Sequence, residues 1–316
     1  MMAVMSESSR WFIVINPVSG GGRALRRWPR LSAALDRHGV EHESAITSQA
    51  GHAVELTQQA IARGRRRLLA LGGDGSFNEL INGLVEQREV PLEQLLAAVA
   101  PVGTGNDWAH AMQVPDDPDL LAEAMARGKT RCVDLGVARV PGEAGSPLRR
   151  LAFHNNAGAG INAEALRQTP RGGPRAIAYL IGLARALMRY QAPRFEVSAD
   201  GRRQSGRYLI ALAAIGHYYG AGMRLAPAAL IDDGFFDLVL IETMSIKAAL
   251  RRLPKLFNGR LMADPAVYTV RCRSATIHAT PACGVEIDGQ DFGSTPVELT
   301  LMPGALRVLD CRASAE

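Results

Sequence analysis

Three glycine-rich segments, each directly after a short apolar run, restrict what this chain can fold into more than any other feature. The segments are 16–22, 72–75 and 101–105, and they follow the apolar runs 11–15, 68–71 and 97–100. Helix-like patterns come after them, and strands that alternate with helices predict a mostly parallel sheet covered on both faces. Because ligands bind beyond the carboxyl ends of such strands, the three segments predict one ligand site.

The pattern changes after about residue 131, where strand-like runs dominate. They cover 131–139, 151–155, 195–199, 208–213, 236–242 and 268–278, with helical stretches at 175–190 and 246–262. A chain of 316 residues exceeds what one core usually serves. We therefore expect an α/β protein of two domains, with an α/β nucleotide-binding domain over 1–135 and a β-sandwich domain over 136–316.

Composition narrows the class of protein. Hydrophobic residues make up 47% of the chain, and the formal net charge is +5. A basic surface suits anionic partners, but no zinc-finger spacing or aromatic RNA-binding motif indicates nucleic acid. The start of the chain has no signal-peptide pattern, and the four cysteines are scattered without a C-x-x-C pair. We expect a cytoplasmic protein with reduced thiols and no membrane-spanning segment.

The first two glycine-rich segments suit a phosphate group. In Asn16-Pro17-Val18-Ser19-Gly20 the glycines that follow let backbone N–H groups approach an anion. The segment Gly72-Gly73-Asp74-Gly75 adds one carboxylate to such a turn. A carboxylate beside phosphates implies a cation between them, so Mg²⁺ is expected at Asp74. The alternative is a tight turn in which Asp74 caps a helix.

The third segment continues as Gly103-Thr104-Gly105-Asn106-Asp107. Thr104 offers a hydroxyl, and Asn106 and Asp107 can cap the next helix while facing the same site. The alternative is an ordinary capped turn that binds nothing.

Together these segments resemble a known family. Asn-Pro-x-Ser-Gly, Gly-Gly-Asp-Gly-Ser-x-Asn-Glu and Pro-x-Gly-Thr-x-Asn-Asp-x-Ala occur here in that order. This arrangement resembles the diacylglycerol kinase catalytic-domain family, which includes bacterial YegS-type lipid kinases. The resemblance implies a fold like that of the NAD kinases, with the cleft between two domains. It also implies ATP contacts at Asn16, Pro17, Val18, Ser19, Gly20, Thr47, Gly73, Asp74, Gly75, Ser76, Phe77, Asn78, Glu79 and Thr104.

The same resemblance implies a structural Mg²⁺ site in the second domain. The Asp233 carboxylate and the carbonyls of Leu230 and Phe235 would be its ligands. Oxygen ligands suit a hard cation. The alternative, which the sequence permits equally well, is an Asp-Asp-Gly turn without metal.

One departure from the family pattern concerns catalysis. The family has Asp-Gly-Glu near its end, with the Glu proposed as proton acceptor, whereas this chain has Asp288-Gly289-Gln290. A glutamine side chain cannot accept the proton of an attacking hydroxyl. Asp288 can serve instead, base catalysis can matter little, or activity can be weak or altered. We favour Asp288 as the base, and we take Asp74, Asp288 and Gln290 as the catalytic candidates.

The expected function is an ATP- and Mg²⁺-dependent lipid kinase that phosphorylates a hydroxyl of diacylglycerol, phosphatidylglycerol or a sphingoid base. Residues 175–190 and 246–261 combine leucines with Arg and Lys, so either helix can contact the membrane surface, wall an acyl-chain pocket or simply pack on its own domain. We expect peripheral association with the inner face of the membrane, and a homodimer is the default oligomer.

Two rival functions remain from the sequence. An NAD kinase would have the same fold class and a different acceptor, but the first and third segments disfavour it. A non-catalytic lipid- or nucleotide-binding protein is supported only by Gln290.

Overall fold

The computed structural model describes residues 9–103, 105–142, 147–170, 175–220 and 222–312. The chain forms two compact units, one of residues 1–133 with 304–316 and the other of residues 134–303. The division expected from sequence, 1–135 and 136–316, did not include this return of the C-terminal segment to the first unit. Strands β5 (Thr130–Val140) and β15 (Val297–Leu309) run from one unit into the other.

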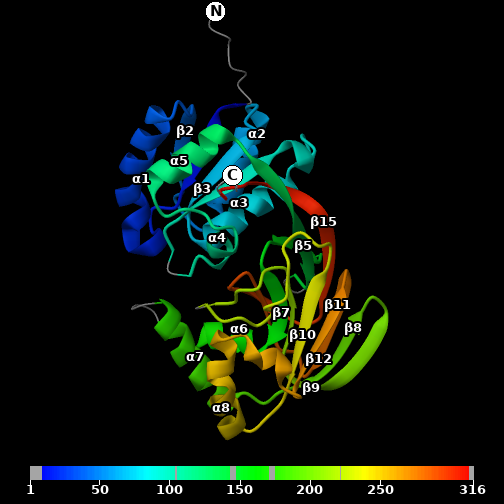
Figure 1. Ribbon diagram of the computed structural model, residues 1–316. Helices are drawn as coiled ribbons and strands as arrows, with labels where there is room; N and C mark the ends of the chain where they lie inside the picture. Colours follow the sequence, from blue (N-terminus) through cyan, green and yellow to red (C-terminus); the bar gives the residue numbers. More distant parts are fainter. Residues whose placement is uncertain (1–8, 104, 143–146, 171–174, 221, 313–316) are drawn as a thin grey trace, which may run out of the picture. The chain divides into compact units, whose positions relative to one another are not determined.

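The first unit is built on a parallel sheet with strand order β4-β3-β1-β2 (Figure 1). Val308 at the end of β15 pairs in parallel with Ala97 of β4. In chain order, the elements of this unit before β5 are β1 Trp11–Ile15, α1 Ser19–Arg37, β2 His42–Ile46, α2 His52–Ala62, β3 Arg67–Gly72, α3 Asp74–Glu86, the 3-10 turn Leu92–Gln94, β4 Leu96–Pro101, α4 Asp107–Ala111 and α5 Pro118–Arg127.

Helices cover both faces of this sheet, which explains why its central strands are apolar throughout. Leu31 and Leu35 of α1 and Leu121 of α5 share one core cluster with Ile13 and Leu69 of the sheet. Helices α2 and α3 pack against each other and contact β1 and β3. All five residues of β1 are buried, as expected for a strand with both faces covered. The predicted α/β fold of this part is confirmed.

The second unit is a sandwich of two antiparallel sheets. One contains β6 (Arg149–Phe153), β5, β15, β12 (Ser274–Thr280), β8 (Arg194–Ala199) and the first half of β9 (Arg202–Ala214). The other contains β14 (Gln290–Ser294), β13 (Gly284–Ile287), β7 (Asn156–Gly160), the second half of β9, β10 (Phe236–Glu242) and β11 (Val267–Cys272). Phe153 of β6 stacks on Phe236 of β10 at 5.6 Å between ring centroids, so aromatic rings fill the space between the sheets. The predicted β-sandwich is confirmed.

The elements of the second unit differ from those expected in several places. Their bounds are β6 Arg149–Phe153, β7 Asn156–Gly160, α6 Ile161–Arg167, α7 Arg175–Arg189, β8 Arg194–Ala199, β9 Arg202–Ala214, β10 Phe236–Glu242, α8 Ile246–Phe257, the 3-10 turn Arg260–Ala263, β11 Val267–Cys272, β12 Ser274–Thr280, β13 Gly284–Ile287 and β14 Gln290–Ser294. The helix predicted at 246–262 is thus α8 followed by the 3-10 turn.

The single strand predicted at 268–278 is wrong, because the chain changes sheets at Arg273. Strand β11 pairs with β10 in one sheet, and β12 pairs with β8 and β15 in the other. Between them the Arg273 backbone N–H donates to the Asp200 carboxylate instead of to a neighbouring strand. Strand β7, with the sequence Asn-Ala-Gly-Ala-Gly, was not predicted because its residues have low strand propensity and only its pairing with β9 and β13 defines it.

Helices α6, α7 and α8 gather on the second sheet of this unit (Figure 1). Ile210 and Leu212 of β9 and Val239 of β10 share a core cluster with Tyr179 of α7 and Leu261. Among the helices that the structure describes, none is long and apolar enough to cross a membrane.

Candidate active site

The loop after β1 has the backbone conformation of an anion-binding turn. Gly20, Gly21 and Gly22 have φ angles of 59°, 67° and 82°, a left-handed run that only glycine adopts at low cost. A Cβ on Gly20 would lie 2.1 Å from the carbonyl oxygen of Val102, so this loop packs directly on the loop after β4. The Asn16 amide donates to Ser76 Oγ at 2.9 Å and thereby joins the first loop to the loop after β3.

The loops after β3 and β4 also touch each other. A Cβ on Gly103 would lie 3.0 Å from Gly73 Cα and 2.6 Å from Asn106 Oδ1. All three glycine-rich segments therefore meet at one edge of the parallel sheet, as the sequence predicted. Helix α3 begins at Asp74, and the first N–H groups of a helix have no partner within it, so they are available to a phosphate. Thr104 lies outside the described residues.

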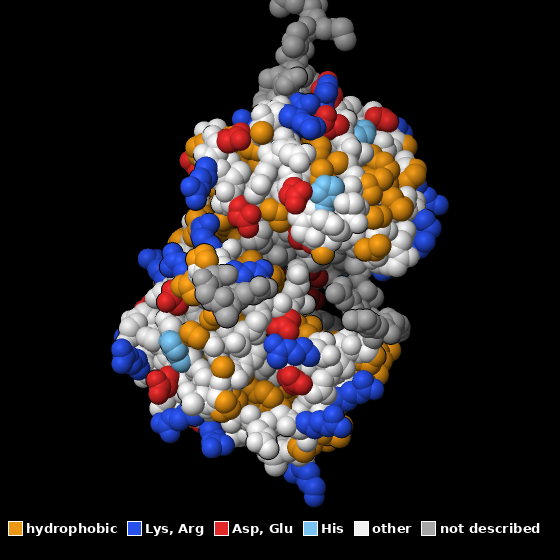
Figure 2. All heavy atoms as spheres, turned by 180° about the vertical axis from the view of Figure 1, so that it is seen from behind, with side chains coloured by type: hydrophobic (Ala, Val, Ile, Leu, Met, Phe, Trp, Pro, Cys, Tyr) orange, Lys and Arg blue, Asp and Glu red, His pale blue; other side chains and the backbone are white. Residues whose placement is uncertain are grey.

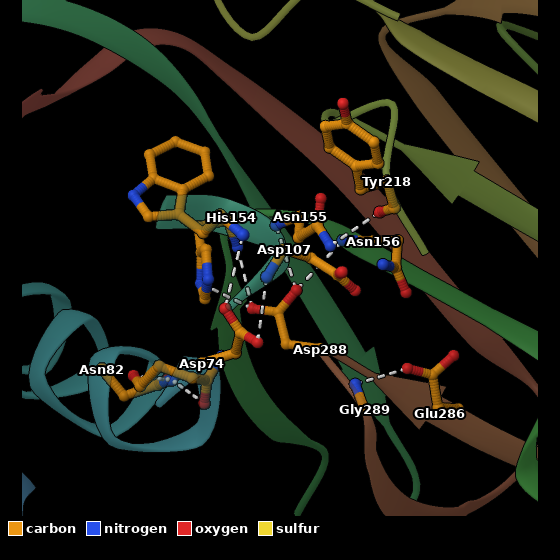
Figure 3. A network of polar contacts seen from close by, with 12 residues as sticks. Asp74, Asn82, Asp107, His154, Asn155, Asn156, Tyr218, Glu286, Asp288 and Gly289 are labelled. Atoms are coloured by element: carbon orange, nitrogen blue, oxygen red, sulfur yellow. Dashed lines mark hydrogen bonds and ion pairs between the residues drawn. The ribbon is translucent and has the colours of Figure 1, made fainter. Parts of the chain in front are cut away.

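Asp74 contacts the start of a different helix from its own. Its carboxylate accepts hydrogen bonds from the backbone N–H groups of Asp107 and Trp108, both at 3.3 Å (Figure 3). Asp74 therefore stabilises the N-terminus of α4. It caps a helix, as the alternative interpretation of the sequence had it, but that helix is α4 and not α3, to which Asp74 itself belongs.

A second carboxylate lies beside Asp74. Asp107 is buried, and burial, together with the negative charge of Asp74, raises the pKa of Asp107 to about 7. Two carboxylates that repel each other next to phosphate-binding loops suit a divalent cation, which would offset the repulsion. The residues present thus fit a Mg²⁺ ion that accompanies a nucleotide.

Two arginines of α1 that the sequence analysis did not single out support these loops. Arg23 donates to the carbonyl oxygens of Gly20 at 3.0 Å and Gly103 at 3.3 Å. Arg27 donates to the Pro101 carbonyl and the Asp116 carboxylate, each at 2.7 Å. Arg23 and Arg27 lie four residues apart, and therefore on one face of the helix that follows the first loop. This spacing was the available signal in the sequence that both could contact the loops.

The other predicted nucleotide contacts lie around the same sheet edge. Thr47 is buried, and its backbone N–H donates to Ile15 at the end of β1. Glu79 accepts a bond from the Ala53 N–H at 3.3 Å, at the start of α2. Phe77 is buried and stacks on Trp108, and Asn78 is buried beside Asn82. Their side chains are therefore not exposed to a ligand, and the Phe77 backbone N–H already donates to the Gly73 carbonyl.

In the second unit the Asp288 carboxylate is surrounded by donors. It accepts backbone N–H bonds from His154, Asn155 and Asn156, each at 3.0 Å, and its Oδ2 lies 2.8 Å from His154 Nδ1 (Figure 3). Asp288 and Gly289 both have positive φ, at 46° and 77°, and form the turn between β13 and β14.

These contacts do not support Asp288 as the proton acceptor. Burial acts to raise the pKa of Asp288, but the charge of His154 and hydrogen bonds from His154 and Asn156 outweigh it and lower the pKa. A carboxylate with a lowered pKa and four donors around it is a weak base. Its geometry is that of a group that fixes the 154–156 segment and the 288–289 turn.

Glu286, which the sequence analysis missed, is a second fully buried carboxylate in this unit. It accepts hydrogen bonds from Asn162 Nδ2 and the Tyr219 hydroxyl, each at 2.9 Å. The Gly289 N–H donates to it as well (Figure 3). Burial raises the pKa of Glu286 to about 7, against the opposing effect of these donors. A charged residue between the apolar Val285 and Ile287, directly before the Asp288-Gly289 turn, was the available signal in the sequence.

Glu286 should make stability depend on pH. Because its folded-state pKa is raised above its ordinary value of 4.5, the native protein binds more protons than the unfolded chain between about pH 4.5 and 7. We expect the free energy of unfolding of wild type, relative to Glu286→Gln, to fall by about 3 kcal/mol as pH rises through this window. Urea denaturation at several pH values tests it. Glu298→Gln, which removes an exposed carboxylate, is the control, and a pH-independent difference between wild type and Glu286→Gln would contradict the expectation.

An apolar cavity lies beside this network in the second unit. Its free space is about 630 Å³, part of it open to solvent, and helices α6, α7 and α8 enclose it with strands β9 and β10. Its walls include Leu183 and Leu187 of α7, Leu253 and Leu256 of α8, and Ile210 and Ile241 of the strands. Asn162, Tyr179 and Tyr219 bring polar atoms to an otherwise apolar surface.

The predicted Mg²⁺ site at Asp233 does not fit its surroundings. One oxygen of Asp233 pairs with Arg271 Nη2 at 2.5 Å, and the other accepts the Phe235 N–H at 3.1 Å. The Arg271 guanidinium also lies 4.4 Å from the Phe235 ring centroid. A cation at Asp233 would have to displace this guanidinium. The site predicted with Leu230 and Phe235 is therefore replaced by a turn held by an ion pair.

Comparison with known proteins agrees with both units. Residues 10–138 match the diacylglycerol kinase catalytic domain, and residues 155–310 match the YegS C-terminal NAD kinase beta sandwich-like domain. The diacylglycerol kinase of Bacillus subtilis (strain 168) is 25% identical over 309 residues, which cover 96% of this chain and 97% of that protein. The diacylglycerol kinase of Staphylococcus haemolyticus is 26% identical over 90% of this chain and 83% of its own length.

The fold has a counterpart among solved structures. A diacylglycerol kinase from Bacillus anthracis superimposes with a TM-score of 0.69 over 97% of this chain and 98% of that one, at 20% identity. Both domain models match this chain, one after the other along the sequence. The chain therefore belongs to the family of proteins that combine a diacylglycerol kinase catalytic domain with a YegS-type C-terminal domain.

Proposed function

We propose that this protein is an ATP- and Mg²⁺-dependent kinase that phosphorylates a hydroxyl group of a lipid. The observation that carries the proposal is the apolar cavity of the second unit, in a chain whose other unit bears three joined glycine-rich loops. An NAD kinase has no need of such a cavity, because NAD is polar. The names of the relatives, diacylglycerol kinase, support the same acceptor class.

In this proposal the first unit binds the nucleotide. Backbone N–H groups of the loop at Asn16–Gly20 and of the start of α3 hold the phosphates. Asp74 and Asp107 hold the cation and fix α4, and Arg23 supports two of the loops. Bound Mg²⁺ supplies neutralisation of the charge that develops on the transferred phosphoryl group.

No side chain of the 288–290 turn is well suited to accept the hydroxyl proton. Asp288 is engaged by four donors, and Gln290 does not titrate. Phosphoryl transfer depends mainly on positioning and charge neutralisation. We therefore propose that Asp288 positions the turn and that Gln290 orients the lipid hydroxyl through its amide.

The lipid would be drawn from a membrane surface by the face of α7 and α8. Both helices lack Asp and Glu, and both expose Arg or Lys beside apolar side chains. The exposed apolar residues are Ile177, Ile181 and Met188 on α7 and Ile246, Leu250 and Phe257 on α8. Figure 2 shows hydrophobic and basic side chains next to each other at the lower right, where these helices lie. Such a surface suits an anionic bilayer.

The proposal is tested by phosphate transfer from ATP labelled at the γ-position, with Mg²⁺ and mixed micelles of diacylglycerol, phosphatidylglycerol or a sphingoid base. NAD in a parallel reaction represents the rival acceptor. Label in a lipid product identifies the acceptor. Label in NAD alone would establish the rival, and nucleotide binding without any transfer would favour a non-catalytic protein.

In the same assay Gln290→Glu reports on base catalysis. Because positioning and charge neutralisation dominate the proposed reaction, we expect the variant's kcat to stay within about threefold of wild type. A gain of about a hundredfold, the size that a general base contributes, would show that the missing carboxylate limits this enzyme.

A further inference from the structure

Helix α8 forms one wall of the apolar cavity, yet few of its side chains are buried. Of its twelve residues only Ala249 is buried, and Leu253 and Leu256, which line the cavity with it, are half-buried. Pro254 inside the helix has no N–H to donate, which weakens the helix itself. Apolar packing and helix propensity alone therefore hold α8 only weakly over the cavity.

A buried carboxylate next to α8 supplies a further attachment. Asp264, which follows the 3-10 turn after α8, has a side chain that is 3% exposed. Its Oδ2 accepts hydrogen bonds from Arg252 Nε at 2.8 Å and from Lys255 Nζ at 3.0 Å. Its Oδ1 accepts the Ala266 N–H at 3.2 Å. One buried carboxylate thus holds two cations that lie three residues apart on the same face of α8.

The two cations are within reach of an anionic surface, whereas the carboxylate is not. The Arg252 side chain is 27% exposed and the Lys255 side chain is 44% exposed. The headgroups of an anionic bilayer attract Lys and Arg near the membrane surface. Such a bilayer therefore competes with Asp264 for both cations.

Release of these cations and movement of α8 are coupled. A buried carboxylate that loses its partners is strongly disfavoured unless water reaches it. Asp264 therefore releases Arg252 and Lys255 at low cost only when the helix that carries them moves away and admits water. The same movement uncovers the cavity wall formed by Leu253 and Leu256.

We propose that α8 is a lid, which its contacts with Asp264 hold over the cavity in water and which anionic headgroups open by binding Arg252 and Lys255. The exposed side chains of Leu250 and Phe257 then enter the bilayer surface. The cavity is thus uncovered where a lipid can enter it. The proposal rests on the lipid-kinase function above and adds control of lipid entry by the charge of the membrane.

A thiol inside the cavity reports whether the lid opens. Ile241 lines the cavity and is 8% exposed, so Ile241→Cys places a thiol there. Its reaction with N-ethylmaleimide, a small reagent that also crosses bilayers, is followed by mass spectrometry of the peptide that contains position 241. Cys272 is fully buried in the neighbouring strand β11 and reports on unfolding in the same sample.

The charge of the vesicles is the first variable. Anionic vesicles of dioleoylphosphatidylglycerol should accelerate the reaction at position 241 about tenfold over the lipid-free protein, the size expected from the loss of hydrogen bonds between charged groups. Vesicles of dioleoylphosphatidylcholine, which carry no net charge, should leave the rate unchanged. Equal acceleration by both kinds of vesicle, or by neither, overturns the proposal.

Two further substitutions in this parent assign the effect to Asp264. Asp264→Asn keeps an oxygen for the Ala266 N–H but loses the charge that holds the cations. Without any vesicle it should react at position 241 about tenfold faster than the parent. Arg251→Gln removes an exposed cation of α8 that forms no ion pair with a described residue, and it should react at the parent's rate. A parent-like rate in Asp264→Asn contradicts the lid.

Cys272 separates opening of the lid from loss of the fold. If Asp264→Asn also exposes Cys272, that variant has unfolded, and the combined substitution Arg252→Gln and Lys255→Gln decides instead. Fast reaction at position 241 alone then supports the lid, and any other pattern overturns it.

The assay contains no nucleotide, so its result is independent of phosphate transfer. A lid that opens in a protein without transfer contradicts the kinase and leaves the lid standing. A protein that phosphorylates lipid while position 241 responds to no vesicle keeps its function and has no such lid.

Discussion

Asp74→Asn should lower the rate of phosphate transfer to lipid by at least a hundredfold. The substitution keeps the shape of the side chain and one oxygen for the N–H groups of Asp107 and Trp108, but it removes the negative charge that holds the cation. Loss of a group that places charge at a phosphoryl-transfer site has effects of this size or larger. The measurement is kcat/KM in the labelled-ATP assay at saturating Mg²⁺.

Two controls accompany Asp74→Asn: the melting temperature of the variant itself, and the substitution of a second carboxylate in the same unit. Its melting temperature should stay within a few degrees of wild type, because one capping bond remains. Asp119→Asn removes an exposed carboxylate of the same unit that pairs with Arg37, and it should leave the rate unchanged. Full activity of Asp74→Asn would show that Asp74 is only a helix cap.

Asp288→Ala should destabilise the protein by about 3–5 kcal/mol. The carboxylate accepts three buried backbone N–H groups and pairs with His154, which is fully buried. Removing the carboxylate leaves the buried N–H groups and the His154 side chain without their acceptor, and each buried group that loses its partner costs about 1–3 kcal/mol. Urea denaturation of the two proteins at pH 7 gives the difference in unfolding free energy.

Asp291→Ala is the matched control for this change. Asp291 lies three residues further on and pairs with Arg167 on the surface, so its loss should cost about 1 kcal/mol or less. If Asp288→Ala were as stable as wild type and yet inactive, Asp288 would be the proton acceptor that the sequence suggested, and its structural role would be wrong.

The loops of the proposed nucleotide site could be predicted because their signals are local. Each glycine-rich segment follows an apolar strand directly, and parallel strands place their carboxyl ends at one edge, so Gly20, Asp74 and Gly103 had to meet. The supporting roles of Arg23 and the capping of α4 by Asp74 depend on contacts between segments 30 to 80 residues apart. Those contacts leave no periodic pattern in the sequence.

The roles of the carboxylates in the second unit, which we propose binds the lipid, required the tertiary structure. Asp288 reads as a candidate base in the sequence, and its role changes because residues 154–156, more than 130 positions away, direct three N–H groups at it. Asp233 reads as a metal ligand, but Arg271 from β11 already occupies its carboxylate. Glu286 and Asn162 carry no motif at all.

The sequence by itself determined the fold class, the α/β order of the first unit, the sandwich of the second and the loops that suit a phosphate. These follow from hydrophobic periodicity and glycine placement, which act over a few residues. Only the tertiary structure decided which carboxylates are buried, which are already paired and where an apolar cavity forms. Burial and pairing are properties of segments brought together by folding, so they set the chemistry of Asp288, Glu286 and Asn162 independently of local sequence.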